Sequence, residues 1–521
     1  MGLQDDPQRE PAPTSPGLGK KAASGALWMT AQKWLMRLTG LVTIAILARL
    51  LDPQDFGVVA VASAVVPFVL LLSDLGLSTY LVQVEDPDRR TLSTGFWFSL
   101  IAAVVLGGAL TAAVPAIVDL LNVPDAAPVL RVLLLSVPLV VCGSVPSALL
   151  RRHLAFKRLA MQSAIAAGAA QVVAVVLALS GAGVWALVAQ TLTAAAIQTG
   201  AAWISARWLP SLQFSRERFA EMMRFGYKIV AVDILGVARN WAETAIVAVA
   251  LGVTGLGYLA IAQRLVQVAQ DLGGSAIIPV STVVLAQVRS TPDRLRSAYM
   301  RASALTYLTV SPVLTFVAVA APVVLPLLFG PQWDPAVAVT RGLAVAGVLT
   351  LGAMVDQSLF YALGRPGVWF GYAIVTEVVT VGATAVAVHS GLTAVAWAFV
   401  GVALAATIAR WALVSRHVGI AAPALARQFG SVVVCAGASS AAGWLALQVT
   451  PGPLVVQCAV VGLVMVTVQI LLVRLVATPV YRDALELAPI PSGVRARISR
   501  LSLLGAGPDR LPDDAPEATR V

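Results

Sequence analysis

The sequence predicts an all-α polytopic membrane protein of about 14 transmembrane helices, with two pseudo-twofold six-helix lobes plus two C-terminal helices. Of its 521 residues, 58% are hydrophobic and only 12% are charged, whereas soluble domains carry about 25% charged residues. The mean hydropathy is +0.85. Apolar runs of about 20 residues, the length that spans a hydrocarbon core of roughly 30 Å, follow one another along the chain. Lipid is therefore the expected solvent for most of the chain.

The apolar runs form two sets of six and a final pair. The first run is too long for the core of a cleavable signal peptide, so we interpret the polar segment before it as a retained tail. Helices are predicted near 24–50, 58–83, 92–118, 128–150, 160–180, 184–208, 227–251, 257–286, 300–328, 336–362, 367–388, 392–415, 428–449 and 454–477. The predicted segments are a disordered cytoplasmic tail 1–23, an N-lobe 24–208, a cytoplasmic inter-lobe loop 209–226, a C-lobe 227–415, helices 13 and 14 within 428–477, and a cytoplasmic tail 478–521.

Lys and Arg occupy every second connection between the predicted helices. Short basic connections favour the cytoplasmic side of a membrane. The intervening connections, from 51–57 to 450–453, contain neither residue, so they are predicted to be external and both termini cytoplasmic. The basic connections carry Arg89, Arg90, Arg151, Arg152, Lys157, Arg158, Arg216, Arg218, Arg224, Lys228, Arg289, Arg294, Arg296, Arg365, Arg416 and Arg427.

An internal repeat relates the two sets of six helices. Residues 51–62 match 251–262 at a constant offset of 200, and 74–78 are echoed by 271–275. Because each set has an even number of helices, both sets have the same orientation, and the pseudo-twofold axis should follow the membrane normal with a cavity between the lobes. Coincidence in a chain rich in Ala, Val, Leu and Gly is the alternative. The identities in the first pair are Leu51 with Leu251, Gly57 with Gly257, Ala60 with Ala260 and Ala62 with Ala262.

Basic residues inside the predicted helices point to a cationic cavity. A charged residue at a helix centre costs roughly 2.5 to 3.5 kcal/mol on insertion scales, so it normally faces a protein interior or a wet cavity. Arg and Lys bind phosphate by charge-assisted hydrogen bonds, which suits a pyrophosphate between a polyprenyl chain and a glycan. The predicted pyrophosphate and cavity residues are Lys33, Arg37, Arg264 and Arg239. Gln263, Gln267 and Gln270 recur at helical spacing with Arg264 and Asp271, and we predict one polar stripe facing this cavity.

Acidic residues inside the helices are candidates for binding a coupling ion. The chain has no nucleotide-binding P-loop pattern, so a transporter of this sequence would depend on H+ or Na+. No other cofactor and no metal site are predicted. A structural ion pair is the alternative for Arg239 with Glu243, and helix capping or interhelical bonding for Asp74 and Asp271. The ion-coupling candidates are Asp74, Asp271, Asp233, Glu243 and Glu377, and Asp356 is a further intramembrane acid.

Residues 50–62 and 74–83 resemble the polysaccharide-transporter (lipopolysaccharide biosynthesis, O-antigen flippase) family of the multidrug/oligosaccharidyl-lipid/polysaccharide exporter superfamily, and 256–264 is similar to it as well. The resemblance implies a two-lobed bundle that alternates between inward-open and outward-open states around a cationic cavity. It also implies that Lys33 and Arg37 on the first helix and Arg264 on the eighth line that cavity. The second helix departs from the related lipid II flippases, since it has no Arg or Lys between Gly57 and Val82.

The leading hypothesis is a flippase, not an enzyme, in a bacterial inner (cytoplasmic) membrane. It would move a polyprenyl-pyrophosphate-linked oligosaccharide from the inner to the outer leaflet by alternating access, for cell-surface polysaccharide synthesis. The expected partners are the polyprenyl-linked glycan and membrane lipid, with a polysaccharide polymerase or glycosyltransferase as a candidate and no nucleic acid. An H+- or Na+-coupled drug or small-molecule exporter of the same superfamily is the alternative. A channel would need a pore loop, and a glycosyltransferase a large catalytic loop; neither is apparent.

Overall fold

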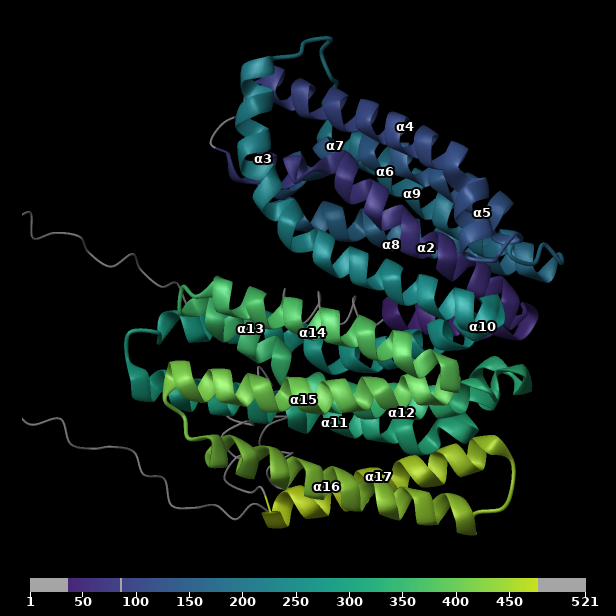
Figure 1. The fold of residues 1–521 in the computed structure, drawn as a ribbon, viewed down its shortest axis with the longest axis vertical. Helices are drawn as coiled ribbons and strands as arrows, with labels where there is room; N and C mark the ends of the chain where they lie inside the picture. The colour runs from purple at the N-terminus through teal and green to yellow at the C-terminus, as the bar shows by residue number, and fades with distance from the viewer. Residues whose placement is uncertain (1–35, 85–86, 477–521) are drawn as a thin grey trace, which may run out of the picture.

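The computed structural model describes residues 36–84 and 87–476, and all regular secondary structure in these residues is helical (Figure 1). The all-α prediction is therefore confirmed. A leading helix covers 36–50. It is followed by α2 (Pro53–Asp74), α3 (Leu77–Gln83), α4 (Arg89–Leu120), α5 (Ala126–Leu134), α6 (Ser136–Cys142), α7 (Ser144–Arg152), α8 (Phe156–Leu179), α9 (Trp185–Ala206), α10 (Arg216–Gln287), α11 (Pro292–Phe329), η1 (Pro331–Trp333), α12 (Ala336–Thr350), α13 (Gly352–Ala362), α14 (Pro366–Ala387), η2 (Val388–Ser390), α15 (Leu392–Val418), α16 (Ala422–Val449) and α17 (Leu454–Val476).

Eleven helical segments among the described residues are long and apolar enough to cross a membrane. Three features account for the difference between these eleven segments and the predicted fourteen helices. Much of the first predicted helix lies outside the described residues, α9 is not among the eleven, and α10 counts once although it covers two predicted helices. The protein is a multi-pass membrane protein, and the count of fourteen stays a prediction.

Several helices differ from their predicted limits for local reasons. α10 begins at Arg216 rather than near 227, because the Ser215 hydroxyl accepts a hydrogen bond from the Arg218 N–H (3.4 Å) and so caps the first turn. α10 then bends at Gly252, whose φ of 72° and ψ of 178° interrupt the helix between its two halves. The second predicted helix is likewise divided, by left-handed residues Leu75 and Gly76.

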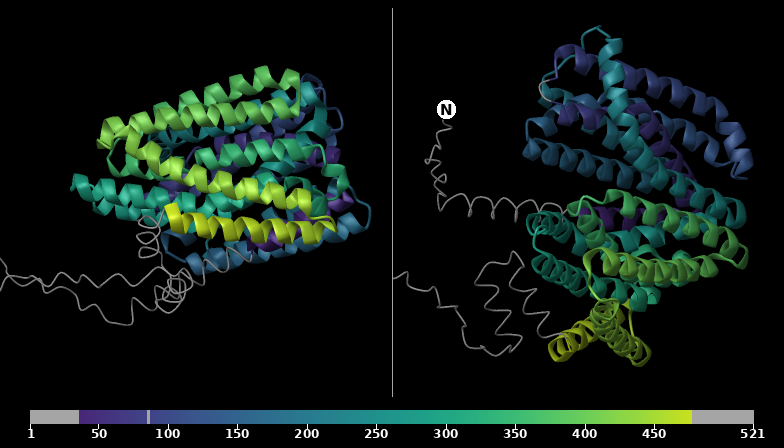
Figure 2. Two further views of the ribbon diagram at one scale, coloured as in Figure 1. Left: turned by 90° about the horizontal axis from the view of Figure 1, so that it is seen from below. Right: turned by 60° about the vertical axis from the view of Figure 1, so that its left-hand side comes forward.

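The helices form two bundles, and α10 runs from the upper bundle, beside α3, to the end at which the bundles meet (Figure 1). The N-terminal bundle contains α2 to α9, and the C-terminal bundle contains α11 to α15. The α16–α17 pair packs on α11, at the side of the C-terminal bundle away from the N-terminal bundle (Figure 2). α10 contacts both bundles, since it packs on α2, α3 and α4 and also on α11 to α14. Its two halves therefore line the space between the bundles.

The two bundles meet closely where Gly57 of α2 crosses Gly257 of α10. A Cβ atom on Gly57 would lie 1.8 Å from the carbonyl oxygen of Val253, and one on Gly257 would lie 1.9 Å from that of Pro53. The contact is reciprocal, and both pairs of residues differ by the same 200 positions as the sequence repeat. A pseudo-twofold axis passing between the two glycines explains this geometry. The structure thus supports a true repeat rather than coincidence.

Hydrogen bonds to helix-end carbonyls strengthen this junction, which we call the joined end. The Trp333 indole and the Gln332 amide both donate to the carbonyl oxygen of Ala48 at 2.8 Å. Arg49 donates to the carbonyl oxygen of Leu328 at 3.1 Å. These donors satisfy carbonyls that a helix leaves unpaired in its last turn. The Trp333 ring is fully buried and packs edge-on against Phe56, with centroids 5.2 Å apart.

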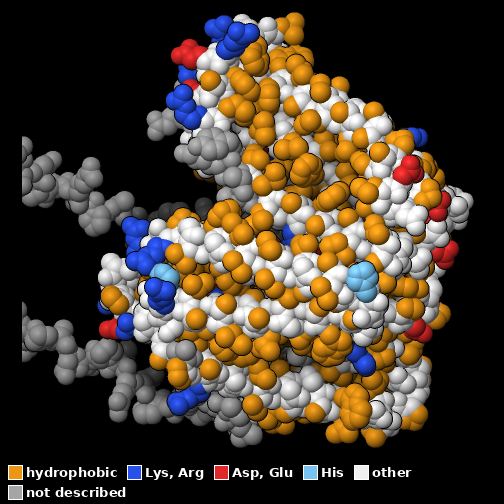
Figure 3. All heavy atoms as spheres, viewed as in Figure 1, with side chains coloured by type: hydrophobic (Ala, Val, Ile, Leu, Met, Phe, Trp, Pro, Cys, Tyr) orange, Lys and Arg blue, Asp and Glu red, His pale blue; other side chains and the backbone are white. Residues whose placement is uncertain are grey.

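Charged side chains divide between the two ends of the molecule. In the face shown in Figure 3, Lys and Arg gather at the end away from the junction, and Asp and Glu are prominent at the joined end. We call the first of these the basic end. The bundles diverge toward it (Figure 1). The separation of basic from acidic side chains agrees with the alternation of basic connections in the sequence. The assignment of the basic end to the cytoplasm stays a prediction.

Candidate functional site

Three adjoining cavities lie along α10 between and inside the bundles. The arginine chamber, about 510 Å³, lies between the leading helix, α8 and α10 and contains Arg37 and Arg264. The central chamber, about 590 Å³, lies between α2, α9 and α10. The aromatic chamber, about 620 Å³, is lined by α10, α12, α13, α14 and α15, with Trp369 and Tyr372 among its residues. The central chamber shares lining residues with each of the other two, so the three adjoin one another along α10.

The arginine chamber combines two cations, one carboxylate and an apolar wall. A guanidinium nitrogen of Arg37 lies 3.2 Å from a carboxylate oxygen of Asp271, and Arg37 also donates to the Asp271 carbonyl. The two side chains are 28% and 45% exposed, so they are accessible from the chamber. Arg264 donates to the Gln267 side chain at 3.3 Å. The rest of the wall consists mainly of small and apolar residues, such as Ala160 on α8.

Uncharged polar side chains from the N-terminal bundle and from α10 line the central chamber, together with the charged Glu243 and Arg264. Gln171 on α8 and Gln190 and Thr191 on α9 face Asn240 and Gln267 on α10 across it. Gln171, Gln190 and Asn240 were not among the predicted site residues, because a prediction that follows charge and one polar stripe passes over isolated amides. Amide side chains within apolar runs are the signal that would have found them, since each amide offers both donors and acceptors.

A four-residue polar network forms one wall of the aromatic chamber. Arg239 lies 2.9 Å from a carboxylate oxygen of Glu377 on α14 and 3.1 Å from one of Glu243. Gln263 donates to the other oxygen of Glu243 at 2.9 Å. Glu243 is only 3% exposed, whereas Arg239 and Glu377 are partly exposed. The network therefore connects both halves of α10 to α14 at the chamber surface.

The polar stripe predicted on the eighth helix borders more than one chamber. Gln263, Gln267 and Gln270 line the aromatic chamber, whereas Arg264 and Asp271 line the arginine chamber. Adjacent residues of an α-helix point about 100° apart because the helix has 3.6 residues per turn. The second half of α10 therefore presents two polar faces, one to each chamber, with Gln267 and Arg264 meeting in the central chamber between them.

The other predicted site residues lie apart from these chambers or outside the described residues. Asp74, near the end of α2, accepts hydrogen bonds from the hydroxyl (2.8 Å) and the backbone N–H (3.4 Å) of Ser78, which fits the capping alternative. It lines a separate cavity of about 250 Å³ in the N-terminal bundle, together with Arg151. Lys33 and the side chain of Asp233 lie outside the part of the chain that the structure describes.

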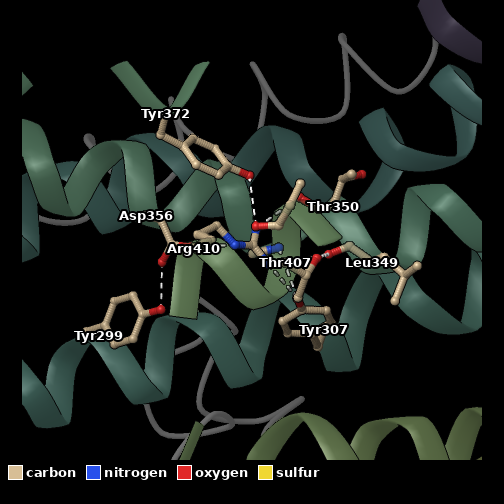
Figure 4. Close-up of polar contacts among 10 residues, drawn as sticks. Tyr299, Tyr307, Leu349, Thr350, Asp356, Tyr372, Thr407 and Arg410 are labelled. Atoms are coloured by element: carbon tan, nitrogen blue, oxygen red, sulfur yellow. Dashed lines mark hydrogen bonds and ion pairs between the residues drawn. The ribbon is translucent and has the colours of Figure 1, made fainter. Parts of the chain in front are cut away.

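A buried ionic network lies in the C-terminal bundle at the break between α12 and α13 (Figure 4). Arg410 of α15 pairs with Asp356 of α13 at 2.9 Å, and each side chain is only 1% exposed. Tyr299 of α11 donates to the other Asp356 oxygen at 2.6 Å. Arg410 also donates to the carbonyl oxygens of Leu349 (3.3 Å) and Thr350 (3.5 Å), which the break leaves without their usual helical partners. Its full burial and its ion pair with Asp356 indicate a structural role.

Comparison with known families identifies the chain. The family described as "Polysaccharide biosynthesis protein" matches residues 46–338, which is more than half of the sequence. The chain belongs to this polysaccharide biosynthesis family. The match begins in the leading helix, includes all of α2 to α11, and ends in α12, so it covers most of the elements that line the arginine and central chambers.

Two curated relatives agree with the family assignment. The succinoglycan biosynthesis transport protein ExoT of Rhizobium meliloti (strain 1021) is 31% identical over 346 residues, which are 66% of this chain and 70% of the relative. The lipopolysaccharide biosynthesis protein WzxC of Escherichia coli (strain K12) is 26% identical over 365 residues, 68% of this chain and 73% of the relative.

Solved structures place this polysaccharide biosynthesis protein in a transporter fold. The lipid II flippase MurJ in an inward closed conformation has a TM-score of 0.71 at 12% identity, and the match covers 86% of this chain and 99% of that chain. An inward-facing multidrug resistance transporter of the multidrug/oligosaccharidyl-lipid/polysaccharide superfamily has a TM-score of 0.61 at 20% identity, covering 74% and 94%. The family, together with a relative named as a transport protein, indicates a membrane transporter rather than an enzyme.

Proposed function

We propose that the protein is a flippase that moves a polyprenyl-pyrophosphate-linked oligosaccharide from the inner to the outer leaflet of a bacterial cytoplasmic membrane. The observation that carries the proposal is the combination of surfaces in three adjoining chambers. The arginine chamber sets small, mostly apolar residues of α8 beside Arg37 and Arg264, and the other two chambers are lined with amides and hydroxyls. A lipid-linked oligosaccharide combines the parts that would match these surfaces: an apolar chain, a pyrophosphate and a glycan.

The charges of the arginine chamber favour an anionic ligand. Two guanidinium groups against the single carboxylate of Asp271 give the chamber a formal charge of +1. A pyrophosphate would bind Arg264 and compete with Asp271 for Arg37, because guanidinium groups form paired hydrogen bonds with phosphate as readily as with carboxylate. Exchange of Asp271 for the ligand would connect binding to movement of the leading helix relative to α10.

Alternating access follows from the way the bundles are joined. The Gly57–Gly257 crossing and the Trp333 hydrogen bonds hold them at one end, while the basic end is free to open and close. With the basic end in the cytoplasm, the described state would receive substrate from the inner leaflet. ExoT and WzxC are named for the biosynthesis of succinoglycan and lipopolysaccharide, which supports a polysaccharide precursor as the cargo. Coupling to H+ or Na+ and supply by a membrane glycosyltransferase or polymerase remain part of the proposal.

One observation favours an exporter of cationic compounds as a second candidate. The aromatic chamber contains two carboxylates, Glu243 and Glu377, against one cation, Arg239. Aromatic rings and carboxylates are the groups that bind organic cations. In that case Arg37 and Arg264 would be dispensable for transport, whereas Glu377 would be essential.

The test is to delete the gene and measure polyprenyl-linked saccharides by mass spectrometry, with their leaflet assigned by sensitivity to an impermeant oxidant. Complementation would compare the wild type with Arg37→Ala and Arg264→Ala. Arg131→Ala is the matched control, since Arg131 is exposed on α5 and lines none of the three chambers. We expect an intact lipid-linked oligosaccharide to accumulate on the inner leaflet in the deletion strain and in both chamber variants. Unchanged lipids in the deletion strain would rule out the flippase.

A further inference from the structure

We propose that the aromatic chamber is the glycan-binding site and that Trp369 and Tyr372 form a platform on which a sugar ring stacks. The inference rests on the proposed function and adds to it the place where the transporter holds the saccharide part of its substrate. It assigns a binding role to Trp369 and Tyr372 on α14 of the C-terminal bundle, in a chamber that neither Arg37 nor Arg264 lines.

The platform is built from three aromatic rings in contact. Trp369 and Tyr372, one helical turn apart on α14, have ring centroids 5.0 Å apart with their planes tilted by 36°. Behind Trp369 lies Phe360 of α13, fully buried and stacked on the indole at 6.1 Å with an angle of 27°. This packing fixes the indole while leaving it partly exposed to the chamber. A side chain held in one orientation loses little conformational entropy when a ligand binds.

The opposite wall offers the hydrogen-bonding groups that a sugar needs. Asn240, Gln263, Gln267 and Gln270 of α10 line the chamber facing α14. Each amide can donate to one hydroxyl and accept from another. The C–H groups on one face of a pyranose are weakly positive and pack on the negative face of an aromatic ring, while the hydroxyl groups at the ring edge seek polar partners. An aromatic surface opposed by amides matches both requirements.

A hydrogen bond also connects the lining of the aromatic chamber to Arg264, which the proposed function places at the pyrophosphate. Gln267 accepts a hydrogen bond from Arg264 at 3.3 Å and lines both the central and the aromatic chambers. A pyrophosphate on Arg264 would therefore place the first sugar in the central chamber and direct the following sugars toward Trp369. The two sites can hold two parts of one molecule.

The test measures binding to the full-length transporter in lipid nanodiscs by native mass spectrometry. Two probes separate the sites: the lipid-linked oligosaccharides that accumulate in the deletion strain, and undecaprenyl pyrophosphate without sugar. We expect Trp369→Ala to weaken binding of the first probe about tenfold or more, as truncation of a central aromatic contact usually does, and to leave the second unchanged. Trp369→Phe should have an intermediate effect. Trp444→Ala is the control, because Trp444 is 50% exposed on α16 and lines none of the three chambers.

The outcomes distinguish this inference from the proposed function. If Trp369→Ala binds the oligosaccharide probe as tightly as the wild type while Arg264→Ala does not, the glycan site is wrong and the flippase proposal stands. Equal weakening of both probes by Trp369→Phe and Tyr372→Ala would also overturn the site, since it would indicate a change in the fold. If the wild type binds neither probe, the proposed function falls together with the inference.

Discussion

The two bundles share a break in one transmembrane helix but differ in the side chains that surround the break. In each bundle a transmembrane helix is interrupted, and a threonine on a neighbouring helix donates to a carbonyl near the break. Thr199 donates to Leu139 at 2.8 Å in the N-terminal bundle, and Thr407 donates to Leu349 at 2.9 Å in the C-terminal bundle. The matching geometry extends the repeat beyond the segments in which residue identities can be recognised.

The interiors around these breaks have diverged. Phe96, the eighth residue of α4, packs edge-on against Trp203 and Trp208, with centroids 5.6 and 5.8 Å away. Tyr299, the eighth residue of α11, instead donates its hydroxyl to Asp356, which pairs with Arg410. The N-terminal bundle is thus held at this position by aromatic packing and the C-terminal bundle by a buried ion pair. Duplication preserved the backbone while the source of stability changed.

The largest expected loss of stability comes from removing one partner of the buried Arg410–Asp356 pair. Arg410→Met alone leaves Asp356 buried without its cation, which typically costs about 3 to 5 kcal/mol. Replacing the whole network, with Tyr299→Phe and Asp356→Leu added, makes the site resemble its aromatic counterpart and should restore much of that loss. The measurement is the free energy of unfolding in mixed detergent micelles. A triple variant less stable than Arg410→Met would contradict the comparison.

The next largest loss of stability is expected at the crossing of Gly57 on α2 with Gly257 on α10. Gly57→Ala and Gly257→Ala each place a methyl group within 2 Å of a backbone oxygen, so α2 and α10 must separate. Overpacking of this kind costs about 1 to 3 kcal/mol. Because the contact is reciprocal, the two substitutions should destabilise the protein and reduce complementation to a similar degree.

Gly401→Ala is the control for the crossing, since Gly401 lies on α15 with no atom near its Cβ position. It should be neutral or slightly stabilising, because alanine favours the helix. Very different losses of stability for Gly57→Ala and Gly257→Ala would argue against an axis between them.

A smaller effect on stability is expected from exchanging the side chains at Phe96 and Tyr299, the eighth residues of α4 and α11. Tyr299→Phe removes a hydrogen bond to a charged group, worth about 1.5 to 3 kcal/mol, although Arg410 still compensates the Asp356 charge, so the lower value applies. Phe96→Tyr buries a hydroxyl among tryptophans and should destabilise by a similar amount. Thermal unfolding of both variants would check this. A stabilising Phe96→Tyr would show that the new hydroxyl finds a hydrogen-bond partner in the aromatic cluster, where the Trp208 indole N–H is buried without one among the described residues.

Much of the fold was predictable because the membrane imposes a simple rule. A transmembrane helix must be apolar and about 20 residues long, and the offset of 200 between Gly57 and Gly257 predicted the pseudo-twofold relation. The close crossing of these two glycines was not predicted and appears only in the structure. The bend at Gly252 and the early start of α10 at Arg216 were not predicted, since both depend on local backbone geometry. Predictions from hydrophobicity cannot distinguish a loop from a bend between two continuous helical segments.

The candidate site was predictable only where charge marked it. Arg37, Arg239 and Arg264 were found because an ionisable residue in an apolar run normally faces a protein interior or a wet cavity. The Arg239–Glu243 pair was foreseen as an alternative from its i, i+4 spacing. The pairing of Arg239 with Glu377 was not, because Glu377 is 138 residues away in the sequence and meets Arg239 only in the folded bundle. The aromatic platform carried no signal at all, since Trp369 and Tyr372 are ordinary residues for a membrane helix.

The smallest expected effect tests whether the two threonine contacts are equivalent. Thr199→Val and Thr407→Val each remove one interhelical hydrogen bond, which is worth about 0.6 kcal/mol on average in membrane proteins. The Leu349 carbonyl also accepts from Arg410 at 3.3 Å, so Thr407→Val leaves that oxygen satisfied. Thr199→Val should therefore be the more destabilising of the two in the same micelle assay. In an Arg410→Met background the cost of Thr407→Val should rise to that of Thr199→Val, because the second donor is gone. If Thr407→Val cost the same stability with Arg410 as with Arg410→Met, the hydrogen bond from Arg410 to the Leu349 carbonyl would contribute nothing. The role of Arg410 would then be confined to its ion pair with Asp356.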